Sequence, residues 1–369
     1  MTNKMKIIIS GGGTGGHIFP ALSIAGALKE HYPDSEILFV GALGRMEMER
    51  VPAAGYRIIG LPVVGFPRKP GLKMFSFFVK LRQSMRQARA IVREFSPHVV
   101  VGVGGYASGP VLRAAAKMKI PTLIQEQNSY AGITNRLLAK KADKICVAYQ
   151  QMERYFPASK IVLTGNPVRS ELLNGLSKTD EARSFYELQP SKKVLLVVGG
   201  SLGARTINQS MLAGIDELKN SDVQVIWQTG KYYYESVLKE LEGLELPNVH
   251  VHQFLSRMDL AYAVADLVIS RAGAGTISEL CLMKKPSFLV PSPNVAEDHQ
   301  TKNALALAQQ NAAIMITDAE APEKLVREAL NVLNNNDMLN ELAINIGKLA
   351  KPNAAADIAQ MVVELAKKQ

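Results

Sequence analysis

Short apolar runs alternate along the chain with longer stretches in which apolar positions recur every three or four residues. The longer stretches, such as 17–31, 107–118 and 130–141, predict amphipathic helices, and the β-branched runs predict strands. In the first half these strands are KIIIS, EILFV, YRIIGLP, HVVVGVGG, PTLIQEQ, KICVAY and KIVLTG. After residue 190 the rhythm resumes with KKVLLVVGG, VQVIWQTG, NVHVHQF, DLVISRAG, PSFLVP and AAIMIT. Continuous apolar strands between helices predict an α/β fold with parallel sheets covered on both faces.

The two halves of the chain repeat one arrangement. IIISGGGTGG at 7–16 and VLLVVGGSLGA at 194–204 each combine a strand, a glycine-rich turn and a helix start. We predict two Rossmann-like domains that face each other across a deep cleft. A GNP sequence before a polar stretch marks the boundary and gives domains at 1–166 and 167–352. The last helix, about 353–369, is expected to pack back on the first domain.

Length and composition support this division and suggest a compartment. A chain of 369 residues favours two domains over one. No apolar run approaches the roughly 18 residues that span a bilayer, and the N-terminus lacks the pattern of a signal peptide. Cys146 and Cys281 lie far apart in apolar contexts, which indicates buried thiols rather than a disulfide framework. We therefore expect a cytoplasmic protein.

Charge is distributed unevenly along the chain. The net charge is +10, yet residues 1–170 carry 24 Lys and Arg against 9 Asp and Glu, and the remainder carries 19 against 24. From Arg50 to Arg93, both included, there are ten basic residues and no carboxylate. This asymmetry indicates that the first half meets something anionic. Nucleic acid, a phosphorylated substrate and an anionic membrane all remain open at this point.

The glycine-rich turn at 10–16 is the leading candidate for a phosphate site. Such a turn converges backbone N–H groups at a helix start, although a tight turn that binds nothing has a similar composition. The sequence Gly16-His17-Ile18 lacks the lysine of an ATP-binding loop, and no acidic residue directly follows the second strand, as a dinucleotide site requires. Similar glycine clusters at 102–110 and 199–205 favour a diphosphate held between two domains.

Other polar residues cluster near predicted strand ends. In RAGAGTISEL, Thr276 and Glu279 fit a helix capping box, but the small residues before them favour ligand binding, with Glu279 on a ribose diol. His17 is a candidate general base or phosphate donor. The acceptor or diphosphate candidates are Gly13, Gly104, Gly105, Tyr106 and Glu126. We expect no metal site and no cofactor, because Asp-x-Asp and metal-ligand spacings are absent from the sequence.

A basic and aromatic segment at 65–94 is the candidate membrane contact. Aromatic residues flanked by Lys and Arg favour an anionic lipid interface, whereas a phenylalanine run is a poor platform for stacking nucleic-acid bases. For 81–94 we favour an ordinary core helix with a basic solvated face. The predicted patch consists of Phe66, Arg68, Lys69, Lys73, Met74, Phe75, Phe77, Phe78 and Lys80.

Seven motifs in order resemble one family over nearly the full chain. They are GGTGGHIFPALSIA, GGYASGP, QEQNSYAGITN, TGNPVR, GGSLGAR, RAGAGTISE and DHQTKNA. The chain resembles the peptidoglycan glycosyltransferases of family 28, which have the two-Rossmann GT-B fold. The resemblance implies inverting transfer of N-acetylglucosamine from UDP-GlcNAc to the 4-hydroxyl of the muramyl sugar of lipid I, an undecaprenyl-linked acceptor, to form lipid II. It also implies a peripheral enzyme on the cytoplasmic face of the inner membrane.

The resemblance further implies a set of donor contacts and partners. By motif match the donor residues are Thr14, Gly15, Gly16, Asn128, Arg169, Ser201, Leu255, Ala274, Gly275, Thr276, Ile277, Ser278, Glu279 and Gln300. His17 becomes the first choice for the base. The expected partners are UDP-GlcNAc, lipid I, the membrane surface and other cell-wall synthesis proteins, without nucleic acid. A UDP-GlcNAc 2-epimerase and a non-catalytic membrane-associated sugar-nucleotide-binding subunit remain as alternatives.

Overall fold

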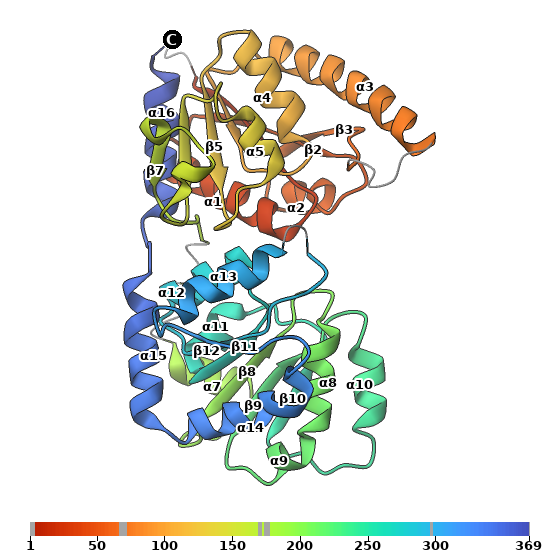
Figure 1. Ribbon diagram of the computed structural model, residues 1–369, viewed down its shortest axis with the longest axis vertical. Coiled ribbons are helices and arrows are strands. Elements are labelled where there is room, and N and C mark those ends of the chain that lie inside the picture. The colour runs from red at the N-terminus through yellow and green to blue at the C-terminus, as the bar shows by residue number, and fades with distance from the viewer. Residues whose placement is uncertain (1–3, 66–71, 169–171, 173–177, 296–297, 369) are drawn as a thin grey trace. The chain divides into compact units, whose positions relative to one another are not determined.

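The computed structural model in Figure 1 describes residues 4–65, 72–168, 172, 178–295 and 298–368. The chain divides into two units. Unit 1 comprises Met1–Arg169 together with Lys351–Gln369, and unit 2 comprises Ser170–Ala350. Each unit holds one parallel sheet, which confirms the predicted α/β class with two Rossmann-like domains.

The sheet of unit 1 has the order β3-β2-β1-β4-β5-β6-β7, and its strands coincide with the seven predicted apolar runs. Its central strands are apolar on both faces because helices cover both. Ile7 and Ile9 are buried in one core cluster, whereas Ile8 between them is buried in the other. The strands are β1 (Lys6–Ser10), β2 (Glu36–Ala42), β3 (Arg57–Leu61), β4 (Val99–Gly102), β5 (Thr122–Glu126), β6 (Lys144–Val147) and β7 (Ile161–Leu163).

Two layers of helices cover this sheet. The cluster around Ile7 and Ile9 contains residues of α1 (Gly15–His31), α2 (Glu47–Ala53) and the distant α16 (Ala354–Ala366). The cluster around Ile8 contains residues of α3 (Leu72–Phe95), α4 (Ser108–Lys117) and α5 (Ile133–Leu138). Two short 3-10 helices, η1 (Met152–Arg154) and η2 (Ala158–Lys160), precede β7. The last helix therefore belongs to the core of unit 1, next to α1.

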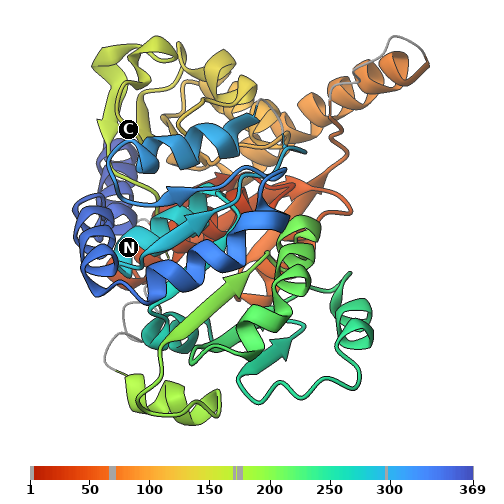
Figure 2. The same ribbon diagram turned by 60° about the horizontal axis from the view of Figure 1, so that its bottom comes forward.

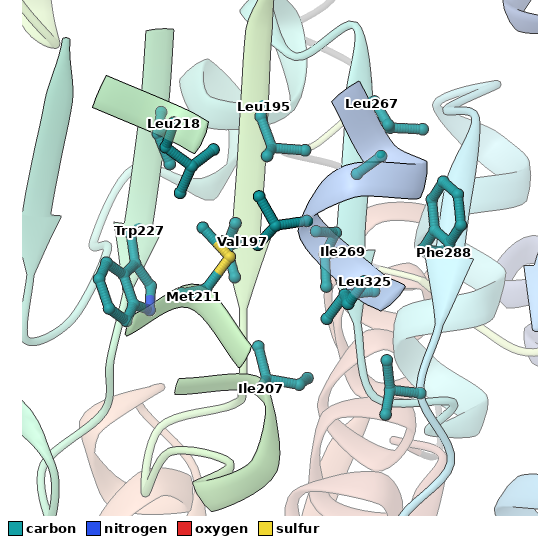
Figure 3. Packing of buried hydrophobic residues seen from close by; sticks show 14 of the residues in the cluster. Leu195, Val197, Ile207, Met211, Leu218, Trp227, Leu267, Ile269, Phe288 and Leu325 are labelled. Atoms are coloured by element: carbon teal, nitrogen blue, oxygen red, sulfur yellow. The ribbon is translucent and has the colours of Figure 1, made fainter. Parts of the chain in front are cut away.

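Unit 2 repeats the design with the order β10-β9-β8-β11-β12-β13. Its strands are β8 (Val194–Val198), β9 (Gln224–Gln228), β10 (Val249–His252), β11 (Leu267–Ser270), β12 (Ser287–Leu289) and β13 (Ile314–Met315). Its helices are α7 (Thr179–Phe185), α8 (Arg205–Ala213), α9 (Ile215–Lys219), α10 (Tyr234–Glu240), α11 (Met258–Val264), α12 (Ala274–Leu282), α13 (His299–Ala308), α14 (Ala321–Leu333) and α15 (Asn336–Lys348). Figure 3 shows part of its core, where Val197, Ile269 and Trp227 lie among helix residues such as Met211 and Leu325.

The strand orders fix where a ligand is expected to bind in each unit. In unit 1 successive strands are added to one side of β1 up to β3 and to its other side from β4 onward. In unit 2 the same change of side occurs between β8 and β11. Loops after such neighbouring strands leave in opposite directions and open a crevice at the carboxyl ends of the strands. The glycine-rich turns after β1, β4, β8 and β11 all lie at these two points.

One predicted helix is much shorter than its periodicity suggests. The stretch 130–141 forms a helix only over α5. The preceding backbone is instead held by the carboxylate of Glu126, which accepts hydrogen bonds from the N–H groups of Asn128 and Gly132. Side-chain hydrogen bonds from a residue just before the predicted helix therefore override its helical pattern.

Candidate functional site

The β1–α1 turn is a tightly packed glycine loop. Gly12 and Gly13 have φ angles of +144° and +92°, which side-chain-bearing residues rarely adopt. A Cβ atom on Gly12 would lie 2.1 Å from Oε1 of Glu47, so only glycine fits there. The N–H of Gly13 donates to both carboxylate oxygens of Glu47, at 3.1 and 3.0 Å. This N–H is therefore directed to a buried protein carboxylate.

The first turn of α1 carries several of the predicted residues. Helix α1 begins at Gly15, so the N–H groups of Gly15 and Gly16 lie in a first turn that has no intrahelical acceptors for them. Thr14 is the N-cap residue, but its hydroxyl does not cap the helix. Thr14 Oγ1 instead lies 3.1 Å from Nδ1 of His17. The helix start thus combines donors for an anion with an oriented imidazole.

The β4–α4 turn lies directly against this loop. Gly104 and Gly105 have φ angles of +91° and +82°. A Cβ on Gly104 would lie 2.7 Å from Cδ2 and 2.8 Å from Nε2 of His17, and a Cβ on Gly105 would lie 2.2 Å from the carbonyl oxygen of Gly12. Tyr106, the next residue, is 54% exposed. Unit 1 therefore brings the predicted residues of both turns together around His17.

The polar residues after β5 form a buried network. Glu126 is 2% exposed and accepts hydrogen bonds from the N–H of Gly132 at 3.0 Å and from Nδ2 of Asn135 at 2.9 Å. Burial raises the pKa of Glu126 above its ordinary value, while the hydrogen bonds from Asn128, Asn135 and Gly132 oppose that rise. Both oxygens of Glu126 are therefore used to shape the loop that presents the half-buried Asn128.

Unit 2 contains a pocket with a volume of about 790 Å³. This volume lies within the roughly 300–1,000 Å³ typical of small-molecule sites. The pocket lies at the carboxyl ends of β8, β11, β12 and β13. It is lined by Val198, Gly199, Gly200, Gly203, Ala204, Arg205, Thr206, Gln209, Tyr233, Arg271, Gly273, Thr276, Ser292, Asn294, Gln300, Asp318, Ala319 and Pro322.

Helix α12 begins at the pocket, and its start differs from a capping box. The N-cap residue is Gly273, and no side chain caps the helix, so Thr276 lies inside the first turn. Thr276 lines the pocket, while Ser278 Oγ donates to the carbonyl of Ala274 at 2.9 Å. Ala274 and Ile277 are buried. The capping interpretation of Thr276 is therefore wrong, and the hydroxyl of Thr276 is not used to cap its own helix.

The other predicted donor residues lie around this pocket or at its margins. Gln300 lines it and accepts a hydrogen bond from the Ser292 N–H at 2.9 Å. Glu279 accepts from the hydroxyl of Tyr262 at 3.1 Å and does not line the pocket. Leu255 is buried, and its N–H donates to Gln228 Oε1 at 2.8 Å. The exposed Ser201 and the half-buried Gly275 flank lining residues of the β8–α8 turn and of α12.

The pocket wall contains a charged cluster that no sequence pattern predicted. Asp318 accepts hydrogen bonds from Nη1 of Arg271 at 2.5 Å and from Oγ1 of Thr206 at 2.7 Å. Nη1 of Arg271 also donates to the carbonyls of Val290 and Pro291, both at 3.1 Å. Arg271 and Asp318 together therefore tie the first turn of α8 to the loops after β11, β12 and β13. Residues 271 and 318 are 47 positions apart, so no local pattern could have paired them.

Some predictions fall outside the described part of the chain. Arg169, Phe66, Arg68 and Lys69 are not among the described residues, and neither is the side chain of Lys73. Within the described ranges, no cluster of three or more His, Cys, Asp or Glu side chains could hold a metal ion. Over those same ranges, none of the helices combines the length and apolar character needed to cross a membrane.

Two Rossmann-like units with glycine-rich loops at their switch points, and a polar pocket in the second unit, are the features of the two-domain GT-B fold. The comparisons agree. Residues 7–147 match the glycosyltransferase family 28 N-terminal domain, and residues 194–361 match the family 28 C-terminal domain. The chain therefore belongs to glycosyltransferase family 28.

Similar proteins extend over the whole chain. A protein of Phocaeicola vulgatus is 60% identical over all of this chain and 98% of its own length, and one of Bacteroides thetaiotaomicron is 59% identical over 99% of both. Both are named UDP-N-acetylglucosamine–N-acetylmuramyl-(pentapeptide) pyrophosphoryl-undecaprenol N-acetylglucosamine transferase. The crystal structure of Acinetobacter baumannii MurG matches with a TM-score of 0.77 and 28% identity, over 98% of this chain and all of that one.

Proposed function

We propose that the chain transfers N-acetylglucosamine from UDP-GlcNAc to lipid I and so forms lipid II for peptidoglycan. The observation that carries this proposal is identity of about 60% to transferases of that name along the entire chain, through both units. The pocket of unit 2 supports it, because its size and its polar lining suit a nucleotide sugar.

The donor is proposed to bind at the carboxyl end of the unit 2 sheet. The N-terminus of α12 and the neighbouring Thr276 supply N–H and hydroxyl donors to the diphosphate, and the dipole of α12 stabilises its charge. Glu279, oriented by Tyr262, accepts hydrogen bonds from the ribose hydroxyls. Negative charge grows on the departing UDP, and fixed donors of this kind stabilise it most at the transition state. The proposal includes no metal or other cofactor.

His17 is proposed as the general base. Its Nδ1 lies against Thr14 Oγ1, so the tautomer with the proton on Nδ1 leaves Nε2 able to accept one. Nε2 takes the proton of the acceptor 4-hydroxyl as that oxygen bonds to C1 of N-acetylglucosamine. The bond between C1 and the diphosphate oxygen breaks, and UDP leaves with the electron pair. A single displacement converts the α linkage of the donor into a β linkage.

Helix α3 is proposed as the contact with the membrane. Phe75, Phe78 and Val79 are 75%, 56% and 51% exposed, and their spacing of three and four residues places them on one face of the helix. Both views show α3 extending beyond the neighbouring helices of unit 1 (Figures 1 and 2). Exposed aromatic side chains close to the exposed Lys80 suit an anionic lipid surface. We propose that the enzyme binds a membrane surface through this helix, and that the surface is the cytoplasmic face of the inner membrane, as the family resemblance implies.

The deciding experiment follows radiolabelled UDP-GlcNAc with a short-chain lipid I analogue. Label in a lipid II product supports the proposal. Tight UDP binding without transfer contradicts it and favours the non-catalytic subunit. Conversion of UDP-GlcNAc to its 2-epimer in the absence of acceptor would instead identify an epimerase. A Glu279→Gln variant, which weakens the proposed ribose contact, is expected to raise KM for UDP-GlcNAc.

A further inference from the structure

Glu47, the first residue of α2, is a buried carboxylate with no assigned role. It is 1% exposed, and burying a charge is costly unless donors surround it. Its Oε1 accepts from the N–H of Ala42 at 2.9 Å, and both oxygens accept from the N–H of Gly13. Among the described residues no Lys, Arg or His forms an ion pair with it. Its partners are therefore backbone N–H groups, one of which lies in the β1–α1 loop.

The carboxylate fits the loop as a template. Cβ atoms added to Gly12 or Gly41 would lie 2.1 Å from Glu47 Oε1 and 2.6 Å from Glu47 Cγ, so the side chain fills the space under both backbones. On its other side Gly12 contacts Gly105 of the β4–α4 turn. The loop is thus held between a charged side chain and a second glycine turn.

This arrangement leads directly to His17. The residue after Gly13 is Thr14, whose backbone carbonyl accepts the N–H of His17 at 3.1 Å and whose hydroxyl contacts the imidazole Nδ1. The ring then lies against Gly104. The structure assigns Glu47 as a positioning residue: we propose that it fixes the β1–α1 loop and thereby holds the imidazole of His17 in its reactive orientation. The inference rests on the proposed function of His17 as the base.

The same contacts bear on how the loop meets anions. The N–H of Gly13 donates to Glu47, and the negative charge of Glu47 lies behind the loop. A phosphate would have to compete with that carboxylate for Gly13, whereas Gly15 and Gly16 in the first turn of α1 have no intrahelical acceptor. We therefore assign the loop mainly to orienting His17 and place any anion contact at the helix start.

A Glu47→Gln variant tests the proposal with almost no change of shape. The amide has one acceptor oxygen and one donor nitrogen, so in either orientation a donor nitrogen replaces one of the two oxygens that accept from the N–H of Gly13. We expect kcat to fall about 10- to 100-fold, since small displacements of a catalytic group have effects of that order. The KM for UDP-GlcNAc is expected to stay within about twofold, because the pocket residues belong to unit 2. The matched control is Glu49→Gln, an exposed carboxylate on the same helix, which should leave kcat unchanged.

A double-mutant cycle separates positioning from general loosening of the fold. If Glu47 acts through His17, the Glu47→Gln/His17→Ala variant is no slower than His17→Ala alone. Fully additive losses, or a kcat within about twofold of wild type for folded Glu47→Gln, would overturn the proposal.

Hydrogen exchange on the wild-type full chain gives a second test that needs no variant. Protection of the Gly13 N–H is expected, and rapid exchange there contradicts the template. Hydrogen exchange does not depend on turnover. Failure of the wild-type chain to transfer sugar would therefore refute the proposed function, whereas protection of the Gly13 N–H separately tests whether Glu47 holds the loop.

Discussion

Two carboxylates, Glu47 in unit 1 and Asp318 in unit 2, lie beside glycine-rich turns. A negative charge is unexpected beside a turn that is interpreted as a phosphate site. Glu47 accepts from the backbone of its loop, and Asp318 accepts from Thr206 and Arg271. Each contact is a charge-assisted hydrogen bond. Glu47 is buried, where such bonds are stronger than at the surface, whereas Asp318 is half-buried in the wall of the pocket. At the residue scale, the loops are therefore shaped by internal acceptors before any substrate arrives.

His17 provides the first prediction at this scale. His17→Ala should lower kcat about 10²- to 10⁴-fold, the usual contribution of a general base, with a small effect on UDP affinity. Steady-state kinetics over pH 5–9 measures it, with His31→Ala, an exposed histidine at the end of α1, as control. A kcat close to wild type at every pH would remove His17 from the role of base.

His250 and His252 provide a prediction on pH and stability. Both lie on β10, and within the described structure the Nε2 atom of each is buried without a hydrogen-bond partner. Burial lowers the pKa of both histidines below the ordinary 6.5, and for His252 the neighbouring His250 lowers it further. Below about pH 6.5 the unfolded chain therefore binds more protons than the folded chain. The stabilisation is complete above that pH and is lost as the pH falls through the lowered folded values.

The measurement is urea unfolding at pH 7.5, 6.5 and 5.5. The free energy of unfolding should decrease toward pH 5.5, and the His250→Gln/His252→Gln variant should show a shallower decrease. An identical pH dependence in the two proteins would show that these histidines do not cause it.

At the scale of elements, α3 leaves three neighbouring apolar side chains, those of Phe75, Phe78 and Val79, more than half exposed along its first turns. Its later turns bury Ser84, Ala88 and Val92, a spacing of four residues that faces the sheet. The same helix therefore packs as a core element at one end and presents phenylalanines at the other. A surface of this kind indicates a contact outside the chain.

The corresponding prediction concerns membrane binding. Replacing Phe75 and Phe78 by Ser should weaken binding to vesicles of phosphatidylglycerol and phosphatidylethanolamine by at least about tenfold, because each phenylalanine loses apolar burial in the lipid. UDP binding in solution should not change. Ile344→Ser, at a comparably exposed apolar side chain on α15, is the control. Equal binding of all three proteins to the vesicles would contradict the assignment of α3.

At the scale of the whole molecule, the last helix completes the first unit although unit 2 lies between them in the sequence. Helix α16 packs against α1, and Ile358, Ala359 and Val362 are fully buried in the core of unit 1. Unit 1 therefore cannot complete its core until the end of the chain is present. Its stability depends on both ends of the sequence.

This dependence can be measured with Ile358→Ala. Removing a buried isoleucine side chain in a packed core is expected to cost about 2–5 kcal/mol of unfolding free energy. Glu364→Ala, an exposed position on the same helix, should change it by less than about 0.5 kcal/mol. Chemical denaturation should be followed by far-UV circular dichroism. Tryptophan fluorescence would report on unit 2, because Trp227, the single tryptophan of the chain, lies there. A cost below 1 kcal/mol for Ile358→Ala would contradict a core role of α16.

The strands and their order of appearance were predictable from the sequence for a physical reason. A parallel strand buried on both faces must be apolar at every position, so β1, β4, β8 and β11 appear as continuous β-branched runs. The 130–141 segment was less predictable, because Glu126 holds the backbone before α5 from outside that segment. The same limitation applied to Thr276, where a local capping pattern competed with a helix that begins at Ala274.

Some residues of the candidate site were likewise predictable from local sequence and others were not. Glycine turns after strands, the first-turn donors of α1 and α12, and His17 follow from local pattern, since a strand, a turn and a helix start are continuous in sequence. The motif resemblance supplied the family, which the domain models confirm. Glu47, Arg271 and Asp318 could not be placed in this way. Glu47 contacts Gly13 across 34 residues and Asp318 contacts Thr206 across 112, so only the sheet order brings these carboxylates to the loops.

The sequence by itself thus determined the two parallel-sheet units, the glycine turns and the family, because these features depend on residues that are near neighbours along the chain. Only the tertiary structure decided which buried acceptors hold those turns and that the N–H of Gly13 is directed to Glu47. It also showed that α16, which was expected to pack on the first domain, lies next to α1 in its core. Those features depend on which strand ends and helix faces lie side by side. That proximity follows from burying apolar surface over the whole fold rather than from any single segment.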